Sequence, residues 1–579
     1  MKTARISLFV VAMAAAVVAC GGKSSSSANA LLSYVPADTP YMFAALEPQP
    51  AALKEKFQPM VDLAIDQYHG MFEQARDALV EGENSADAAD LITVLDALIA
   101  ETADGDISDF GFSSDKDVPV FYGNGLLPVL RMTVSSMDDW NAAYARLTGD
   151  LENGPTTITV DGLEVDVLGG EAPVQVFIAE QDNMLVISLG PKGMGEAEIG
   201  VLLGTSKPAT SIADTGALAD IAERYDFLPQ MQGFLDLQQI FAMVTAEGNP
   251  INDTLFASLP NLPLELDQTC QAEMSGLFEI APRAVVGATK LDGSGSDTLS
   301  VLELRSDVAT ALKPIASVMP GLTAQSDSAL KFGAAMNLQN LRTWVEETLG
   351  GVAESPFECA QLTGLNDMAA QAVGMTQQPI PPVVYNFMGY SIEIGSLEGL
   401  EGVAQQQMPE NLDVDVTLGV KNVEGLMMLG QMFVPQLAQL PLESNGEGVP
   451  LPQELTGPLP LDGFMAMTDD LVGVSVGEGA KSRVEANVSA TAGNEAPLLG
   501  YFSVDAGAYF GFVSDISESA TSGLLENSDV PESERAMIES QQERMRAMAE
   551  AYENLFDRLD VRFELTDRGL EIPARATFK

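Results

Sequence analysis

Two segments of the chain share one alternation of apolar and polar residues. Residues 176–190 read VFIAEQDNMLVISLG, and residues 463–477 read GFMAMTDDLVGVSVG. In each segment apolar stretches flank a polar Asp-Asn or Asp-Asp pair, which is the pattern of a β-hairpin. The segments align without a gap at an offset of 287 residues, so the sequence predicts two related hairpins.

Four further pairs of segments repeat in the same order, at offsets between 290 and 267 residues. They are 41–49 with 331–339, 130–140 with 416–426, 233–238 with 500–505, and 284–304 with 559–578. In the second pair, a strand pattern is followed directly by the predicted start of a helix. Ser136 and Asn422 are at these starts, and both are residue types that favour the N-cap position. The last pair ends in a hairpin whose turn is Asp567-Arg568-Gly569.

These patterns predict an α+β fold of two tandem similar domains, each an antiparallel sheet of hairpins with inserted helices. The domains are residues 31–320 and 321–579, and the boundary lies in the Pro/Gly/Ser/Thr-bearing stretch 320–327. A single large domain with repetitive strands is the alternative. Residues 531–556 carry an apolar stripe of helical period, which favours a helix packed on its own sheet over a partner-binding helix.

The first thirty residues predict export. Lys2 and Arg5 precede an apolar run over residues 6–18, which is too short to span a bilayer and typical of a signal peptide. The run ends in Val17-Val18-Ala19-Cys20 and is followed by glycine. An ordinary secretory signal with an incidental cysteine is the alternative.

This segment resembles the lipobox of bacterial lipoproteins. The resemblance implies a signal peptide over residues 1–19, acylation with palmitate-type chains at Cys20, and attachment to a membrane through that residue. Residues 20–30 are then a Ser-rich flexible tether. Because Gly21, not aspartate, follows the cysteine, the resemblance further implies the cell outer membrane, facing the periplasm or the surface.

Residues 33–48 (SYVPADTPYMFAALEP) and 119–131 (PVFYGNGLLPVLR) carry a second resemblance. They are similar to segments of bacterial envelope lipoproteins that belong to domain-of-unknown-function families. That likeness implies an envelope location and brings no catalytic residues and no known activity.

Composition narrows the possible partners. The 83 acidic residues outnumber the 29 basic ones, for a formal net charge of −54. Such a surface repels a nucleic-acid backbone, and it repels anionic lipid headgroups unless divalent cations bridge them. Apolar residues make up 46% of the chain, which excludes a disordered polyelectrolyte.

Residues for most catalytic chemistry are scarce. The single histidine, His69, is expected on a helix, either at the surface or half-buried, so a Ser-His-Asp triad is not predicted and no catalytic residue is assigned. The chain has too few histidines and cysteines to provide the ligands of a zinc site, and no cofactor is predicted. Asp104, Asp106 and Asp109 form a weak calcium candidate that lacks the glycine and final glutamate of a calcium loop. A solvated acidic loop is favoured there.

The cysteines that follow Cys20 and the methionines are expected to have structural roles. Beyond the inner membrane two remaining cysteines usually pair, so Cys270 and Cys359 are predicted to form a disulfide, with two unrelated buried thiols as the alternative. The 26 methionines, among them Met427, Met428 and Met432, are expected to fill gaps in the cores. Capture of copper or an apolar ligand is the alternative for them.

The sequence favours a non-enzymatic, outer-membrane-anchored lipoprotein that acts as a cell-envelope binding or assembly module. An envelope protein is then the expected partner. Two alternatives stay open: a carboxylate-dependent hydrolase, because 83 acids make any pairing possible, and a receptor for a small ligand held between the two halves.

Overall fold

The computed structural model describes residues 25–81, 89–103, 110–113, 116–149, 151, 154–170, 172–245, 248–259, 266–322, 328–379, 381–397, 412–456, 462–490, 497–525 and 532–579. The chain divides into two compact units, residues 1–300 (unit 1) and 301–579 (unit 2). The sequence placed its domain boundary at 320, so residues 301–320 belong to unit 2. Helices account for 47% and strands for 29% of the structure, which confirms the α+β prediction.

Unit 1 contains a wholly antiparallel sheet in the order β4-β5-β6-β7-β3-β2-β1-β8-β9. The strands are β1 Tyr41–Ala44, β2 Pro119–Asn124, β3 Leu127–Thr133, β4 Thr156–Val160, β5 Leu163–Leu168, β6 Val174–Gln181, β7 Met184–Pro191, β8 Gln232–Asp236 and β9 Arg283–Asp292, with β10 Gly295–Glu303 following β9. The helices are α2 Ser25–Leu32, α3 Ala51–Glu81, α4 Ala89–Thr102, α5 Met137–Thr148, α6 Glu196–Leu203, α7 Ile212–Thr215, α8 Ala217–Tyr225, α9 Leu237–Thr245, α10 Pro250–Ser258 and α11 Gln268–Ile280.

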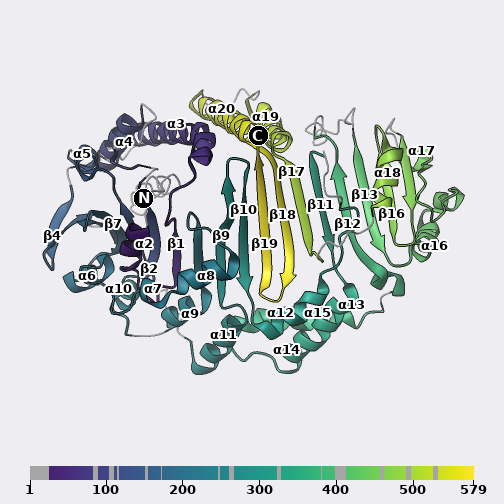
Figure 1. Ribbon diagram of the computed structural model, residues 1–579, viewed down its shortest axis with the longest axis horizontal. Helices are drawn as coiled ribbons and strands as arrows, with labels where there is room; N and C mark the ends of the chain where they lie inside the picture. Colours follow the sequence, from purple (N-terminus) through teal and green to yellow (C-terminus); the bar gives the residue numbers. More distant parts are fainter. Residues whose placement is uncertain are drawn as a thin grey trace. The chain divides into compact units, whose positions relative to one another are not determined.

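In unit 2 the strands pair antiparallel in the order β14-β15-β16-β13-β12-β11-β17-β18-β19. The strands are β11 Leu330–Ala335, β12 Phe387–Ile394, β13 Val414–Val420, β14 Val449–Pro450, β15 Gly463–Met467, β16 Leu471–Val476, β17 Gly500–Asp505, β18 Phe556–Thr566 and β19 Gly569–Phe578. The helices are α12 Ser306–Leu312, α13 Leu338–Trp344, α14 Gly350–Glu354, α15 Thr363–Thr376, α16 Val423–Phe433, α17 Gln453–Thr456, α18 Ala480–Ser489, α19 Ala506–Leu525 and α20 Glu532–Leu555, with short 3-10 or π turns η3 Lys313–Ile315, η4 Val345–Leu349, η5 Ala360–Leu362, η6 Pro382–Asn386 and η8 Pro435–Gln439. Figure 1 shows α19 and α20 side by side at one end of β17 and β18, from which they continue without a loop.

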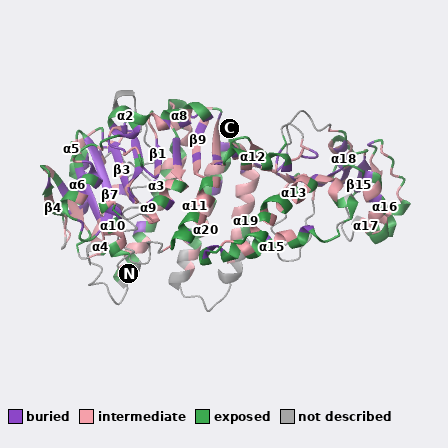
Figure 2. Ribbon diagram, turned by 90° about the horizontal axis from the view of Figure 1, so that it is seen from below, coloured by how far each residue is buried: buried purple, intermediate pink, exposed green. Residues whose placement is uncertain are grey.

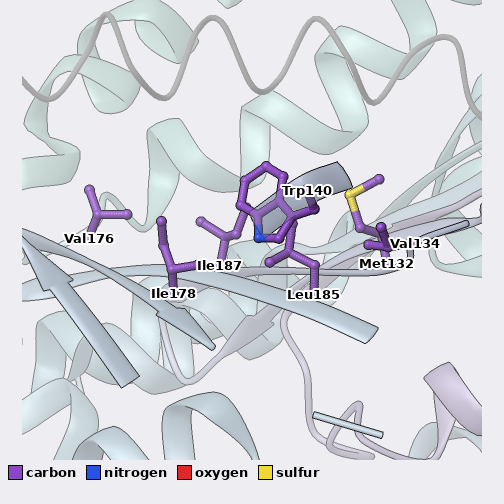
Figure 3. Close-up of a cluster of buried hydrophobic side chains, with 7 residues drawn as sticks. All are labelled: Met132, Val134, Trp140, Val176, Ile178, Leu185 and Ile187. Atoms are coloured by element: carbon purple, nitrogen blue, oxygen red, sulfur yellow. The ribbon is translucent and has the colours of Figure 1, made fainter. Parts of the chain in front are cut away.

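One apolar cluster of unit 1 lies between α5 and the sheet. Trp140 from α5 packs over side chains of β3, β6 and β7, and Figure 3 shows its ring above Ile187 and Leu185. The helix starts where the sequence predicts, because the Ser136 side chain accepts a hydrogen bond from the backbone N–H of Asp139. Buried residues are concentrated in strands such as β3 and β7 (Figure 2).

The corresponding cluster of unit 2 lies under α16. Val423 and Met427 face the sheet and pack with Met465, Met467 and Val472. The predicted N-cap is again present, since Asn422 Oδ1 accepts from the backbone N–H of Gly425 at 3.0 Å. Helix α16 therefore covers β15, β16 and the end of β13, where Val420 belongs to the cluster and Leu418 packs against it.

One predicted segment differs in the structure. The Ser-rich tether was expected over residues 20–30, but residues from Ser25 onward form helix α2. Ala28 and Leu31 are buried in unit 1, so apolar side chains at helical spacing hold this segment on the domain surface. Residues 20–24 lie outside the described part of the chain.

Candidate functional site

The sheet of unit 2 has one continuous apolar face. Residues directly opposite each other in an antiparallel pair point to the same side. Phe332 lies opposite Ile392 and Phe502, and the row continues to Val416 and Val561. With the rows on either side, this apolar face of unit 2 comprises Leu330, Phe332, Ala334, Tyr390, Ile392, Ile394, Val414, Val416, Leu418, Gly500, Phe502, Val504, Leu559, Val561 and Phe563.

This face is uncharged but is not buried. Val504 is its one buried member, Phe563 is 37% exposed, and the other residues are partly exposed; Leu418, at one corner, packs against the α16 cluster. An antiparallel sheet normally turns its apolar side to the core and its polar side to water. Here the apolar side is the one left partly open to solvent.

The opposite face of the same strands is polar and largely buried. It carries Lys331, Ser391, Glu393, Asp415, Thr417, Ser475 and Ser503, of which only Glu393 is not classed as buried. The Lys331 ammonium donates to the backbone carbonyl of Gly321 at 2.9 Å and lies 3.0 Å from the Glu393 carboxylate. Gly321 has a left-handed φ of 64°, and a Cβ there would come within 2.8 Å of Ser391 Oγ. Glycine is therefore required for this close cover.

A second ion pair completes the cover of the polar face. Arg483, on α18, lies 3.1 Å from the carboxylate of Asp415, whose side chain is 7% exposed, and 3.4 Å from Asp413. It also donates to the backbone carbonyl of Val476 at 2.7 Å. These charges are neutralised by neighbours within unit 2, so they stabilise the fold and do not present a reactive group.

Unit 1 has a smaller apolar surface of the same kind, formed by aromatic residues. Phe43 lies opposite Phe121 and Gly233, and the two phenyl rings are 43% and 36% exposed. The Tyr41 ring stacks on Phe121 with centroids 5.7 Å apart. A Cβ at Gly233 would come within 2.5 Å of the Phe43 ring, so glycine lets that ring lie across β8. Burial raises the pKa of the Tyr41 phenol to about 12.

On the other face of the unit 1 sheet, Arg131 is fully buried. Its guanidinium carbon lies 3.8 Å from the centroid of the Tyr34 ring, and its Nη1 donates to Gln181 Oε1 at 3.0 Å. Lys207 approaches the same ring at 4.7 Å, and the Tyr34 hydroxyl donates to Asp182. Burial, with that hydrogen bond, raises the pKa of Tyr34 to about 12. The cluster holds the residues that follow α2 against the sheet.

One pair of acids faces each other across a hairpin of unit 2, the arrangement that a carboxylate-dependent hydrolase would need. Glu564 and Glu571 are directly opposite across the β18–β19 hairpin, and burial raises the pKa of Glu564. Arg568 donates twice to the Glu571 carboxylate, each at 2.7 Å, and Thr566 donates to it as well. Because Glu571 is held by the turn that joins its own strands, this geometry favours a structural role over general acid–base work.

The predicted site residues have different outcomes. Cys270, in the first turn of α11, and Cys359, at the start of η5, form a disulfide bond. Cys20 and the calcium candidates Asp104, Asp106 and Asp109 lie outside the described residues. Within the described ranges no group of three His, Cys, Asp or Glu side chains is placed to hold a metal ion.

His69 lies on the surface of α3. Its ring Nδ1 is 2.9 Å from the Thr102 hydroxyl of α4, and Nε2 is 3.6 Å from the Glu73 carboxylate. These contacts join two helices of unit 1. They fit the predicted position on a helix.

The methionine prediction is correct for Met427 and wrong for two neighbours. Met428 and Met432 are 65% and 77% exposed, because α16 turns Val423 and Met427 to the sheet and its opposite side to water. The sequence reasoning also missed the apolar face itself. The signal was present in strict alternation, as in Val414-Asp415-Val416-Thr417-Leu418, but alternation does not say which side is covered.

Comparison of the chain with protein-family models, with curated proteins and with solved structures gives no match. No helix in the described part of the chain is both long and apolar enough to cross a membrane.

Proposed function

We propose that this protein is a non-enzymatic binding module of the bacterial cell envelope, attached to the outer membrane by acyl chains on Cys20. The observation that carries the binding role is the inverted sheet of unit 2, whose polar face is buried while its apolar face is partly open. Exposed contiguous apolar surface costs free energy in water, and proteins retain it mainly where something binds.

Support for two tandem repeats comes from strand order. In unit 1 the first strand, β1, lies between β2 and β8. In unit 2 the first strand, β11, lies in the same way between β12 and β17. The third strands, β3 and β13, pair with the second strand of a following hairpin, β6–β7 or β15–β16. All five repeated segments of the sequence lie on strands that correspond in this way.

The helices are inserted at matching places as well. In both units a helical segment joins the first two strands, one helix follows the third strand, and further helices join β8 to β9 or β17 to β18. Duplication of one ancestral domain accounts for this shared order.

Strand pairing refines the alignment of the first strands. Across β2 and β12, Phe43 corresponds to Phe332: Phe43 faces Phe121, which faces Leu130, and Phe332 faces Ile392, which faces Val416, the residue aligned with Leu130. The offset is then 289 residues, not the 290 of the sequence match. A one-residue change moves every side chain to the other face, and it brings the apolar surfaces of the two units into correspondence. We take these surfaces to be one binding surface present in two copies.

The position of α2 bears on the anchor. Four residues, 21–24, separate Cys20 from the start of α2, and fully extended they span at most ~14 Å. The Tyr34–Arg131 stack then fixes the chain after α2 to unit 1. An acylated Cys20 would therefore hold unit 1 close to its membrane.

To test the binding role, the native lipoprotein is isolated from envelope membranes, and the lipids and proteins that co-purify with it are identified. Ile392→Asp places a charge in the apolar face of unit 2, and Ile392→Asn is the milder second variant. The control is Met432→Asp, which charges an exposed apolar residue on α16.

We expect a lipid or protein to co-purify with the wild type and with the control, and to be lost from both Ile392 variants. Circular dichroism and melting temperature check that the variants fold. If nothing co-purifies in stoichiometric amount, or if the control loses it equally, the binding role is wrong. A Cys20→Ala protein that still fractionates with membranes would contradict the anchor.

A further inference from the structure

We infer that the apolar face of unit 2 holds the acyl chain of a lipid whose headgroup is not anionic. This inference rests on the proposed binding function and names its ligand class.

The apolar face of unit 2 offers almost no group for hydrogen bonding. The backbone groups of the central strands β17, β11, β12 and β13 are paired on both sides within the sheet. Among the side chains of the apolar face only the Tyr390 hydroxyl can form a hydrogen bond. A peptide laid across this face would leave its own N–H and C=O groups without partners, which costs free energy. A hydrocarbon chain has no such groups.

The width of the face matches the length of one acyl chain. The face extends over five strands, from β18 to β13, which at a spacing of ~4.8 Å is roughly 19 Å from the first strand to the last. Each lipid chain fills about half of a hydrocarbon core that is ~30 Å thick, or roughly 15 Å. One acyl chain laid across the strands therefore fits within the face.

The face is uncharged, although the chain as a whole is strongly acidic. None of the fifteen residues of the face is ionisable at neutral pH, while the whole chain carries a formal −54. An anionic headgroup would be repelled at the rim, and a neutral or zwitterionic one would not. The uncharged part of the ligand then matches the uncharged surface.

A folded protein with its own apolar patch is the competing occupant, and the experiment separates the two. The soluble full-length Cys20→Ala protein is used, so that the chain's own acyl groups do not occupy the site. An uncharged naphthylamine fluorophore reports binding to apolar surface, and monoacylglycerols from octanoyl to stearoyl displace it.

We expect affinity to rise by up to about fourfold for each added methylene, and to level off when the chain exceeds the width of the face. Ile392→Asp should weaken displacement by about tenfold or more, because the chain would then lie against a desolvated carboxylate. Ile392→Asn should weaken it less, and Met432→Asp should leave it unchanged.

The inference is overturned if affinity is independent of chain length, or if Met432→Asp weakens displacement as much as Ile392→Asp does. Its failure is distinguishable from that of the proposed function. If monoacylglycerols do not bind but a protein still co-purifies in an Ile392-dependent manner, the occupant is a protein and the binding role remains. If neither is found, both are wrong.

Discussion

At the scale of the residue, the carboxylate of Asp415 shows what the polar face costs to bury. Its side chain is 7% exposed on β13, and the guanidinium of Arg483 lies 3.1 Å away. Taking a carboxylate out of water is unfavourable unless a cation and hydrogen bonds compensate for it. The arginine on α18 therefore fastens that helix to the sheet and permits the inverted burial.

Replacing this arginine should destabilise unit 2 strongly. Arg483→Leu leaves the buried Asp415 carboxylate without its cation, and we expect a loss of about 2–4 kcal/mol in the free energy of unfolding. Urea denaturation followed by the fluorescence of Trp344, the single tryptophan of unit 2, measures it.

The control for this prediction is an exposed pair. Arg546 lies 2.9 Å from Glu518, with side chains 65% and 56% exposed. Arg546→Leu should cost less than about 1 kcal/mol, because water and salt screen exposed ion pairs. Equal losses in the two variants would mean that burial of Asp415 has no special energetic weight.

At the scale of the element, α5 is the clearest case of a helix fixed by one side chain. Trp140 is 3% exposed and contacts apolar residues from three strands of unit 1 (Figure 3). Trp140→Ala should lower the stability of unit 1 by about 3–5 kcal/mol, since the remaining cavity cannot collapse fully. Thermal unfolding followed by far-ultraviolet circular dichroism measures the change.

Trp344→Ala provides the comparison at this scale. That residue ends α13 and is only partly buried, so its truncation leaves a smaller cavity. The melting temperature should fall less than for Trp140→Ala. A larger fall for Trp344→Ala would show that the α5 cluster is not the main source of stability.

Elements whose signals are local could be predicted from the sequence. The β6–β7 turn is formed by Asp182 and Asn183, both in the left-handed region at φ 52° and 62°, as a two-residue hairpin requires. The N-caps Ser136 and Asn422 depend on their own few neighbours and were predicted correctly. The helix expected over residues 531–556 is α20.

Burial depends on distant parts of the chain and could not be predicted in this way. The alternation Leu330-Lys331-Phe332 indicates two faces of a strand, and a sequence reading turns the apolar one inward. In the structure Lys331 is 2% exposed, because residues near Gly321 cover it, and helix α18 covers the same side of the sheet at β13, β15 and β16. The apolar face stays partly open because segments distant in the sequence cover the polar face instead. No local sequence pattern encodes which face is covered.

At the scale of the whole molecule, the net charge acts on stability. A formal −54 places many like charges closer together in the folded chain than in the unfolded one, so self-repulsion disfavours the compact state. The Debye length falls from ~30 Å at 0.01 M to ~10 Å at 0.1 M and ~3 Å at 1 M ionic strength. Salt should therefore weaken this repulsion.

We expect the melting temperature to rise between ~0.01 M and ~1 M NaCl, with most of the gain reached by ~0.1 M, where the screening length has already dropped to about a third. This shape separates screening from the general strengthening of apolar burial by salt, which grows steadily with concentration. Scanning calorimetry over a salt series measures it. A rise that is linear up to ~1 M would assign the effect to apolar burial, and a melting temperature flat over the whole range would mean that the acids are already well solvated and spread apart in the folded chain.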